Sequence, residues 1–235
     1  MLNMSKLIRA KYNKEDDMIF ISHLDLQRLL QRAFKRAKIN VSYSEGFNPH
    51  PKMSYGNALA LGVESQGEYV DIEIEDDIDA KEFLQRINEQ LPQGIKFLKA
   101  KEIDPKTPSL SSVIAYGEYI FHIDLEKPLS KEFVKSRVLN FIKSKEIIIT
   151  KKNKKGKMVE VDIRPLVKNF DMIYLDEEKV TFVSTIATGS KANLNINILI
   201  AKVMEMLYLD TDPREVGILR RDLYAVEDGE LVTPL

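Results

Sequence analysis

The chain has 235 residues, of which 44% are apolar and 30% are charged, and its formal net charge is −1. This length allows one large domain or two small ones, and this composition excludes an intrinsically disordered chain. Cysteine is absent, which excludes disulfides, cysteine-ligated zinc or iron–sulfur centres and a cysteine nucleophile. The sequence predicts a cytoplasmic protein with no membrane contact, because it shows neither a signal peptide nor an apolar run of about 18 residues.

The charges are unevenly distributed. Residues 1–60 hold ten Lys or Arg and five Asp or Glu, whereas residues 61–90 hold two basic and ten acidic side chains. Such asymmetry can orient a charged partner, such as a nucleic acid. Two solvated surfaces of different charge are the alternative interpretation, and composition alone does not decide between them.

In the first half, the hydrophobic patterns predict the element order β-α-β-β-α-β. Strands are expected at 7–12, 39–44, 68–75 and 95–103, with further strand-like runs at 18–21 and 53–61, and helices at 22–38 and 79–91. Ser22 is a good N-cap for the first helix, with Asp25 at its third helical position. This order is typical of the ferredoxin-like fold.

From Val70 onward, the strand 68–75 alternates strictly between apolar and acidic residues. Its apolar residues, Val70, Ile72 and Ile74, are expected to face the core, and its carboxylates, Asp71, Glu73 and Glu75, to face solvent.

Residues 104–112 contain two prolines and three serines and are the best linker candidate. They divide the chain into a half at 1–103 and a half at 113–235. In the second half we expect strands at 113–125 and 219–226, helices at 130–144 and 194–208, and hairpins within 146–163 and 170–187. The predicted fold class is therefore α+β, with two tandem ferredoxin-like halves, antiparallel sheets and extra hairpins in the second half.

The helix at 22–38 has a basic face opposite its apolar one. Arg28, Arg32, Lys35 and Arg36 make up this face. Guanidinium groups suit bidentate phosphate contacts, and a positive stripe on a helix is one feature of nucleic-acid binding. An ordinary solvated face is the alternative.

The loop at 44–52 is stiffened by one glycine and two prolines. Phe47 and His50 can stack on a base, Lys52 can contact a phosphate, and we assign Asn48 to the same surface. The alternative is a structural connection in which Phe47 fills part of the core.

Histidine chemistry is a second hypothesis. His23 or His50, assisted by a lysine or by Tyr43, could activate a 2′-hydroxyl of RNA by acid–base chemistry. A metal site would need His23 and Asp25 together, but two residues two positions apart on a helix point about 200° apart. Asp25 therefore suits capping or pairing with Arg28, and the sequence predicts neither a metal nor a cofactor.

Lysines crowd the hairpin within 143–157. A basic hairpin can clamp RNA, and it can equally be a soluble tip whose charges prevent edge-to-edge aggregation. The sequence leaves both interpretations open.

Several segments together resemble the radical-SAM-linked family, a domain of unknown function. They are FISHLDLQR at 20–28, RAFKRA at 32–37, YSEGFNPHPK at 43–52, LALGVES at 59–65 and RRDLY at 220–224. The resemblance is dense over 18–75 and weaker beyond. Its members occur alone, fused to radical SAM proteins, or beside ribonuclease-type proteins, which implies RNA metabolism. A radical SAM enzyme needs three closely spaced cysteines, so the resemblance implies an accessory protein here rather than that enzyme.

Three functions follow, and the sequence favours the first over an enzymatic role. The first is an accessory RNA-binding protein that presents RNA to a radical SAM partner. The second is a protein–protein adaptor for such an enzyme, docking through the acidic block 64–89 or by strand addition at 68–75. The third is a metal-independent endoribonuclease that uses the histidines.

Overall fold

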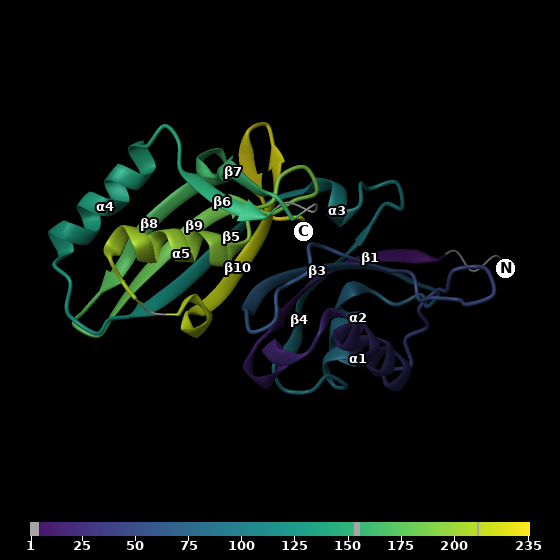
Figure 1. Cartoon of the computed structure of the whole chain (residues 1–235). Coiled ribbons are helices and arrows are strands. Elements are labelled where there is room, and N and C mark those ends of the chain that lie inside the picture. Colours follow the sequence, from purple (N-terminus) through teal and green to yellow (C-terminus); the bar gives the residue numbers. More distant parts are fainter. Residues whose placement is uncertain (1–4, 153–155, 211) are drawn as a thin grey trace. The chain divides into compact units, whose positions relative to one another are not determined.

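The computed structural model describes residues 5–152, 156–210 and 212–235, which form two compact units (Figure 1). The first unit contains the described residues up to Ile114 together with Arg220–Leu235, and the second is Ala115–Leu219. The end of the chain thus returns to the first unit, whereas the sequence predicted a single second half over 113–235.

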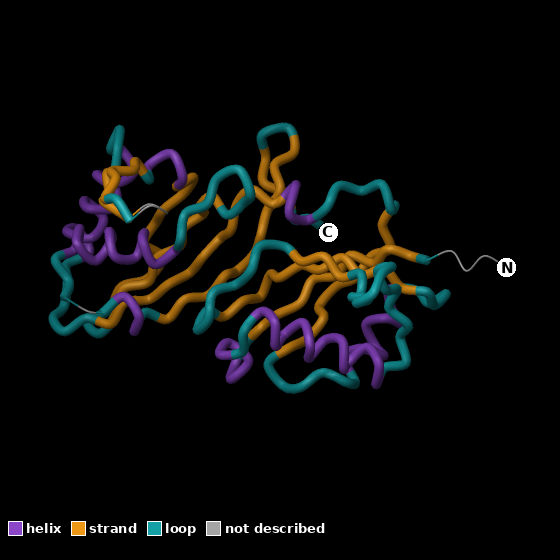
Figure 2. Tube along the Cα trace, turned by 45° about the vertical axis from the view of Figure 1, so that its right-hand side comes forward, coloured by secondary structure: helices purple, strands orange, loops and turns teal. Residues whose placement is uncertain are grey.

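The first unit is built on an antiparallel arrangement of strands. They are β1 (Lys6–Lys14), β2 (Met53–Tyr55), β3 (Glu64–Ile74), β4 (Ile95–Ile103), the later part of β10 (Gly217–Glu227) and β11 (Glu230–Val232). The order is β4-β1-β3-β10, with β2 also beside β3 and β11 beside β10. The β1–β3, β1–β4, β2–β3 and β10–β11 pairs are antiparallel. Both helices, α1 (His23–Arg36) and α2 (Ala80–Asn88), cover the same face of this sheet (Figures 1 and 2).

The helix α1 confirms the predicted amphipathic pattern. The Ser22 hydroxyl accepts a hydrogen bond from the backbone N–H of Asp25 at 3.1 Å, which caps the first turn. The apolar stripe of the helix is buried against the sheet and α2, and it consists of Leu26, Leu30, Ala33 and Phe34. The opposite side of α1 therefore carries its charged residues to solvent.

The edge of this sheet differs from the prediction. Residues 39–44 form only isolated bridges, Val41 to Ile74 and Tyr43 to Pro51, because the chain doubles back and β2 shares the same partner strand. The run 53–61 is a strand only over Met53–Tyr55.

Residues 18–21 are also not a strand, because they fall largely within the 3-10 helix η1 (Asp16–Phe20). The Lys14 ammonium donates hydrogen bonds to the carbonyls of Ile19 and Ile21 and thereby holds this turn against β1.

The outward placement predicted for Asp71 is wrong. The far face of β3 is covered by the short helix α3 (Leu110–Val113), and Tyr69 packs there against Leu110 and Leu223. Asp71 is consequently buried, and its carboxylate accepts two hydrogen bonds from Arg9, at 2.7 and 2.9 Å. A buried carboxylate requires such a partner.

The second unit contains a three-stranded antiparallel arrangement in the order β5-β9-β8, which α4 and α5 cover on one face (Figure 1). Its strands are β5 (Ile114–Asp124), β8 (Val167–Leu175) and β9 (Lys179–Ala187), and its helices are α4 (Lys131–Lys143) and α5 (Ile196–Leu207). A separate hairpin pairs β6 (Ile148–Lys152) with β7 (Met158–Asp162). Part of the lysine-rich turn predicted within 143–157 lies outside the described residues, at 153–155.

The protein is therefore an α+β protein with a large, mostly antiparallel sheet and, in the described ranges, five α-helices. The tandem ferredoxin-like arrangement stays a prediction. No helix in the described part of the chain combines the length and the apolar character needed to cross a membrane.

Candidate nucleic-acid interface

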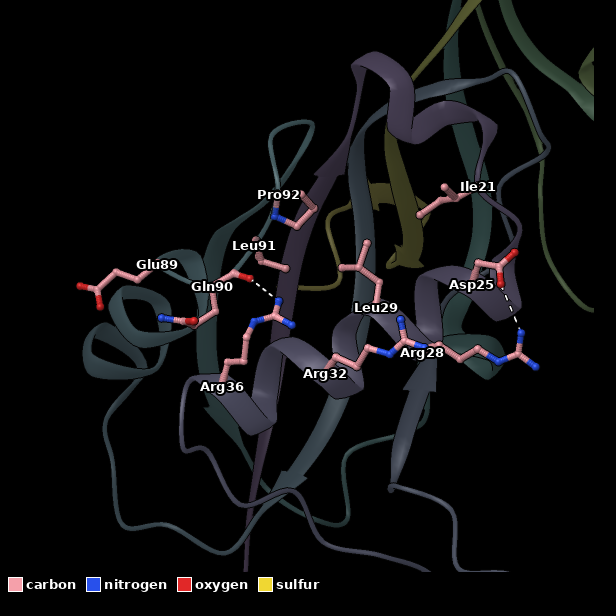
Figure 3. A pocket seen from close by; sticks show the side chains of 10 residues that line it. All are labelled: Ile21, Asp25, Arg28, Leu29, Arg32, Arg36, Glu89, Gln90, Leu91 and Pro92. Atoms are coloured by element: carbon pink, nitrogen blue, oxygen red, sulfur yellow. Dashed lines mark hydrogen bonds and ion pairs between the residues drawn. The ribbon is translucent and has the colours of Figure 1, made fainter.

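Three arginines follow one side of α1 at intervals of four residues. Arg28, Arg32 and Arg36, which we call the arginine row, line a pocket of about 630 Å³ between α1 and the end of α2 (Figure 3). Residues four apart on a helix are neighbours on its surface, about 6 Å apart along the axis. Glu89, Gln90, Leu91 and Pro92 form the opposite wall.

The three arginines differ in how firmly they are held. Arg28 lies 3.3 Å from the Asp25 carboxylate, and Arg36 donates to the backbone carbonyl of Gln90 at 2.7 Å (Figure 3). Arg32 makes no hydrogen bond or ion pair with any described residue. The pKa of Asp25 is lowered by the Ser22 hydroxyl and then by Arg28, so this carboxylate stays charged. The predicted pairing of Asp25 with Arg28 is confirmed.

The fourth predicted cation, Lys35, lies elsewhere. Lys35 lines a second pocket of about 500 Å³, which it shares with Tyr43 and Pro51. The predicted single basic face of α1 is therefore divided between two pockets, and the second of them borders the loop 44–52.

The loop 44–52 is closed by two hydrogen bonds, from His50 N–H to the Ser44 hydroxyl and from Ser44 N–H to the His50 carbonyl, at 3.0 and 2.8 Å. Phe47 is fully exposed at its tip, so the alternative that it fills the core is wrong. Asn48 and His50 are also exposed. Lys52 has an ion-pair partner, the Glu73 carboxylate, 2.9 Å away.

The predicted catalytic candidates are not brought together by any described contact. His23 lies 3.0 Å from the Gln27 amide nitrogen and edge-on to the Tyr55 ring, with centroids 5.0 Å apart. Burial lowers the pKa of His23, which keeps its imidazole neutral near pH 7. Tyr43 lines the second pocket, and His50 lies in the exposed loop. Their acid–base role stays a prediction.

The first unit also contains a buried ionic cluster that the sequence patterns did not predict. Arg220, 2% exposed, binds both carboxylate oxygens of Glu68, which is 4% exposed, at 2.7 and 2.5 Å. The Ser65 hydroxyl donates to the same carboxylate at 2.5 Å. Glu68 follows the period-two pattern of the buried Val70 and Ile72, which was the one local signal of its burial.

Lys14 belongs to the same region. It is 3% exposed, its pKa is lowered by burial, and β1 places it on the inward face with Ala10 and Tyr12. Lys14 lines, with His23 and Glu68, a cavity of only about 10 Å³. This volume is about that of a single water-sized probe, so the cavity has room for about one water molecule.

The adaptor hypothesis of strand addition at 68–75 is wrong. β3 pairs with β1 on one side and with β2 and β10 on the other, so both of its edges are occupied. A strand that is paired on both sides offers no free N–H and C=O groups to a partner.

The fold and this surface define an α+β protein whose first unit presents two open, cation-lined pockets and an exposed aromatic loop. The family described as an uncharacterized protein conserved in bacteria (DUF2344) matches residues 7–196, and the chain belongs to this family. The resemblance to a domain of unknown function is thereby confirmed, whereas the radical SAM link stays a prediction.

A search of the curated proteins found no match. Among solved structures, the chain is similar to a chain of the archaeal box H/ACA sRNP Nop10–Cbf5 complex, with 13% identity, a TM-score of 0.45, and coverage of 93% of this chain and 46% of that one. It is also similar to a chain of a Cbf5–Nop10–Gar1 complex, with 12% identity, a TM-score of 0.46, and coverage of 93% and 47%. The chain spans about half the length of these two chains.

Proposed function

We propose that the first unit binds RNA through the arginine row and the loop 44–52. The observation that carries this proposal is the open pocket of about 630 Å³ that all three arginines line. Arg32 is exposed and has no hydrogen-bond or ion-pair partner among the described residues, so its guanidinium can take a phosphate without first breaking a contact.

The loop supports the same function by a different interaction. Phe47 is held in solvent at the tip of a loop whose ends are tied by the Ser44–His50 hydrogen bonds. Exposure of an aromatic ring to water is unfavourable, and stacking of the ring on an unpaired base is favourable. Rigid loops on a scaffold are common places for such contacts.

The test is fluorescence anisotropy with a labelled single-stranded RNA, comparing the wild type with Arg28→Glu/Arg32→Glu at two salt concentrations. Wild-type affinity should fall by about 0.7 log units per phosphate contact for each log unit of salt. The double variant should bind at least tenfold more weakly and show a shallower salt dependence, because two cationic contacts are lost.

The matched control is Lys99→Glu/Lys101→Glu, which makes the same charge change on β4, outside both pockets. This control should bind RNA almost as tightly as the wild type. Equal loss in both double variants would mean that only net charge matters, and undiminished binding by Arg28→Glu/Arg32→Glu would contradict the proposal directly.

We further propose that the protein acts in the cytoplasm as an accessory to a radical SAM enzyme and presents the bound RNA to it. The family resemblance supports this partner. Co-purification before and after nuclease treatment tests it, because a complex bridged by RNA should dissociate when the RNA is digested. A complex that survives would favour the adaptor function, with docking elsewhere than β3.

We also propose that the chain is organised as two tandem ferredoxin-like halves. The order β1-α1-β2-β3-α2-β4 supports it in the first unit. If the β6–β7 hairpin is treated as an insertion, the strands and α-helices from β5 to β10 follow the same order.

A further inference from the structure

The second pocket, beside the C-terminal half of α1, has the construction of a ligand site. Its volume of about 500 Å³ lies within the range of about 300–1,000 Å³ typical of small-molecule sites. Phe34 and Ile39 are buried core residues that reach its floor, and Met53 packs against the same core. Because the core fixes these residues, the apolar floor is preformed.

The rim of this pocket is polar, and four of its polar groups lack a partner among the described residues. The Gln31 carboxamide, the Lys35 and Lys38 ammonium groups and the Tyr43 hydroxyl make no hydrogen bond or ion pair with any described residue. Asn40, by contrast, is bound by the Asp76 carboxylate. Four uncommitted polar groups around a fixed apolar floor are the arrangement expected where a ligand supplies the missing partners.

The chemistry of the rim identifies the ligand. Two lysines against one carboxylate in the lining, Glu75, favour an anion. A carboxamide can donate to and accept from the edge of a nucleobase, and a half-exposed tyrosine ring, 44% exposed here, provides a stacking surface. A base with an adjacent phosphate satisfies all four groups at once.

We propose that this pocket receives one unpaired nucleobase of a single-stranded RNA, with Gln31 at the base edge, Tyr43 against its ring, and Lys35 and Lys38 at the neighbouring phosphates. The inference rests on the proposed RNA-binding function and specifies its substrate as single-stranded. A base in a duplex has its edge and both faces occupied, so it cannot enter.

The experiment compares short labelled oligoribonucleotides with an abasic strand of the same length, using Tyr43→Ala and Gln31→Leu in the full chain. Stacking is worth about 1–3 kcal/mol per base, so Tyr43→Ala should weaken binding of the normal strand by at least about fivefold. Binding of the abasic strand, which retains the phosphates, should be unchanged. Tyr174→Ala, which removes a similarly exposed tyrosine in the second unit, should leave both affinities unchanged.

Cross-linking with 4-thiouridine in the strand locates the base independently of affinity. The expected product is a cross-link to the peptide that contains Tyr43 or Met53. Mononucleotide binding without oligonucleotide binding would identify a free-nucleotide site and overturn the single-strand proposal.

Different results would refute the base pocket and the arginine row. If Tyr43→Ala and Gln31→Leu bind the normal strand as tightly as the wild type, while Arg28→Glu/Arg32→Glu loses it, the base pocket is refuted and RNA binding stands. If the arginine variant also binds normally, the arginine row is refuted as well.

Discussion

Arg220 and Glu68 are 152 residues apart in the chain, yet the Arg220 guanidinium binds both oxygens of the Glu68 carboxylate, at 2.7 and 2.5 Å. Arg220 also donates to the carbonyl of Asn57 at 2.9 Å. The pair therefore fastens β10 and the segment after β2 to the middle of β3. Two charges buried this deeply tolerate the loss of their hydration only because each is fully paired.

The first prediction concerns this pair. Arg220→Met leaves a buried carboxylate without its cation, and Glu68→Gln leaves a buried guanidinium without its anion. Each change should lower the free energy of unfolding by about 3–5 kcal/mol, and the double variant should lose less than the sum. Urea unfolding of the full chain measures the free energy of unfolding of the wild type, the two single variants and the double variant. Additive losses would show that the two residues act independently.

A second prediction concerns the close approach of β10 to β3. A Cβ atom added at Gly67 would lie 2.5 Å from the Asp222 Cα, and backbone cannot move aside as a flexible side chain can. Gly67→Ala should therefore destabilise the protein by about 1–3 kcal/mol. The neighbouring exposed Gln66 provides the control, because Gln66→Ala should change stability by less than about 0.5 kcal/mol. Equal unfolding midpoints for the two variants would contradict the close packing.

The third prediction is a pH dependence that arises from His23. Burial lowers the pKa of His23 in the folded protein below its ordinary value of 6.5. Between the folded pKa and 6.5 the unfolded chain binds more protons, so stability rises with pH through this window and falls as the solution is acidified. Asp25 and Asp77, whose pKa values are also lowered, titrate below 3.8 and act only in stronger acid.

His23→Gln should therefore weaken the pH dependence of the protein's stability between pH 7.5 and pH 5.5. Urea midpoints of the wild type and the variant at these two pH values provide the measurement. A stability difference between the two proteins that is the same at both pH values would contradict the assignment.

The fourth prediction separates function from stability at Phe47. Because its side chain is fully exposed, Phe47→Ser should leave the free energy of unfolding within about 0.5 kcal/mol of the wild type. It should nevertheless weaken single-stranded RNA binding by at least about fivefold, because one stacking surface is lost. Loss of stability would show that the ring packs on the protein, and unchanged affinity would remove Phe47 from the interface.

The sequence was sufficient where local chemistry decides the structure. Ser22 and the four-residue spacing of apolar side chains defined α1, and the turn residues after Leu91 separated α2 from β4. The same period of the helix placed Arg28, Arg32 and Arg36 on one side, and a glycine with two prolines marked 44–52 as an irregular loop. Each of these features depends on residues within a few positions of one another, so a local pattern carries the information.

Only the tertiary structure decided where the remaining charges lie. Asp71 alternates along its strand like any solvent-facing carboxylate, and it is buried because α3, far along the chain, covers that face and Arg9 supplies the countercharge. Lys35 lines a different pocket from the arginine row, because the edge segment at 39–43 folds against its side of α1. Burial depends on which distant segments pack over a residue, and a one-dimensional pattern holds no information on that packing.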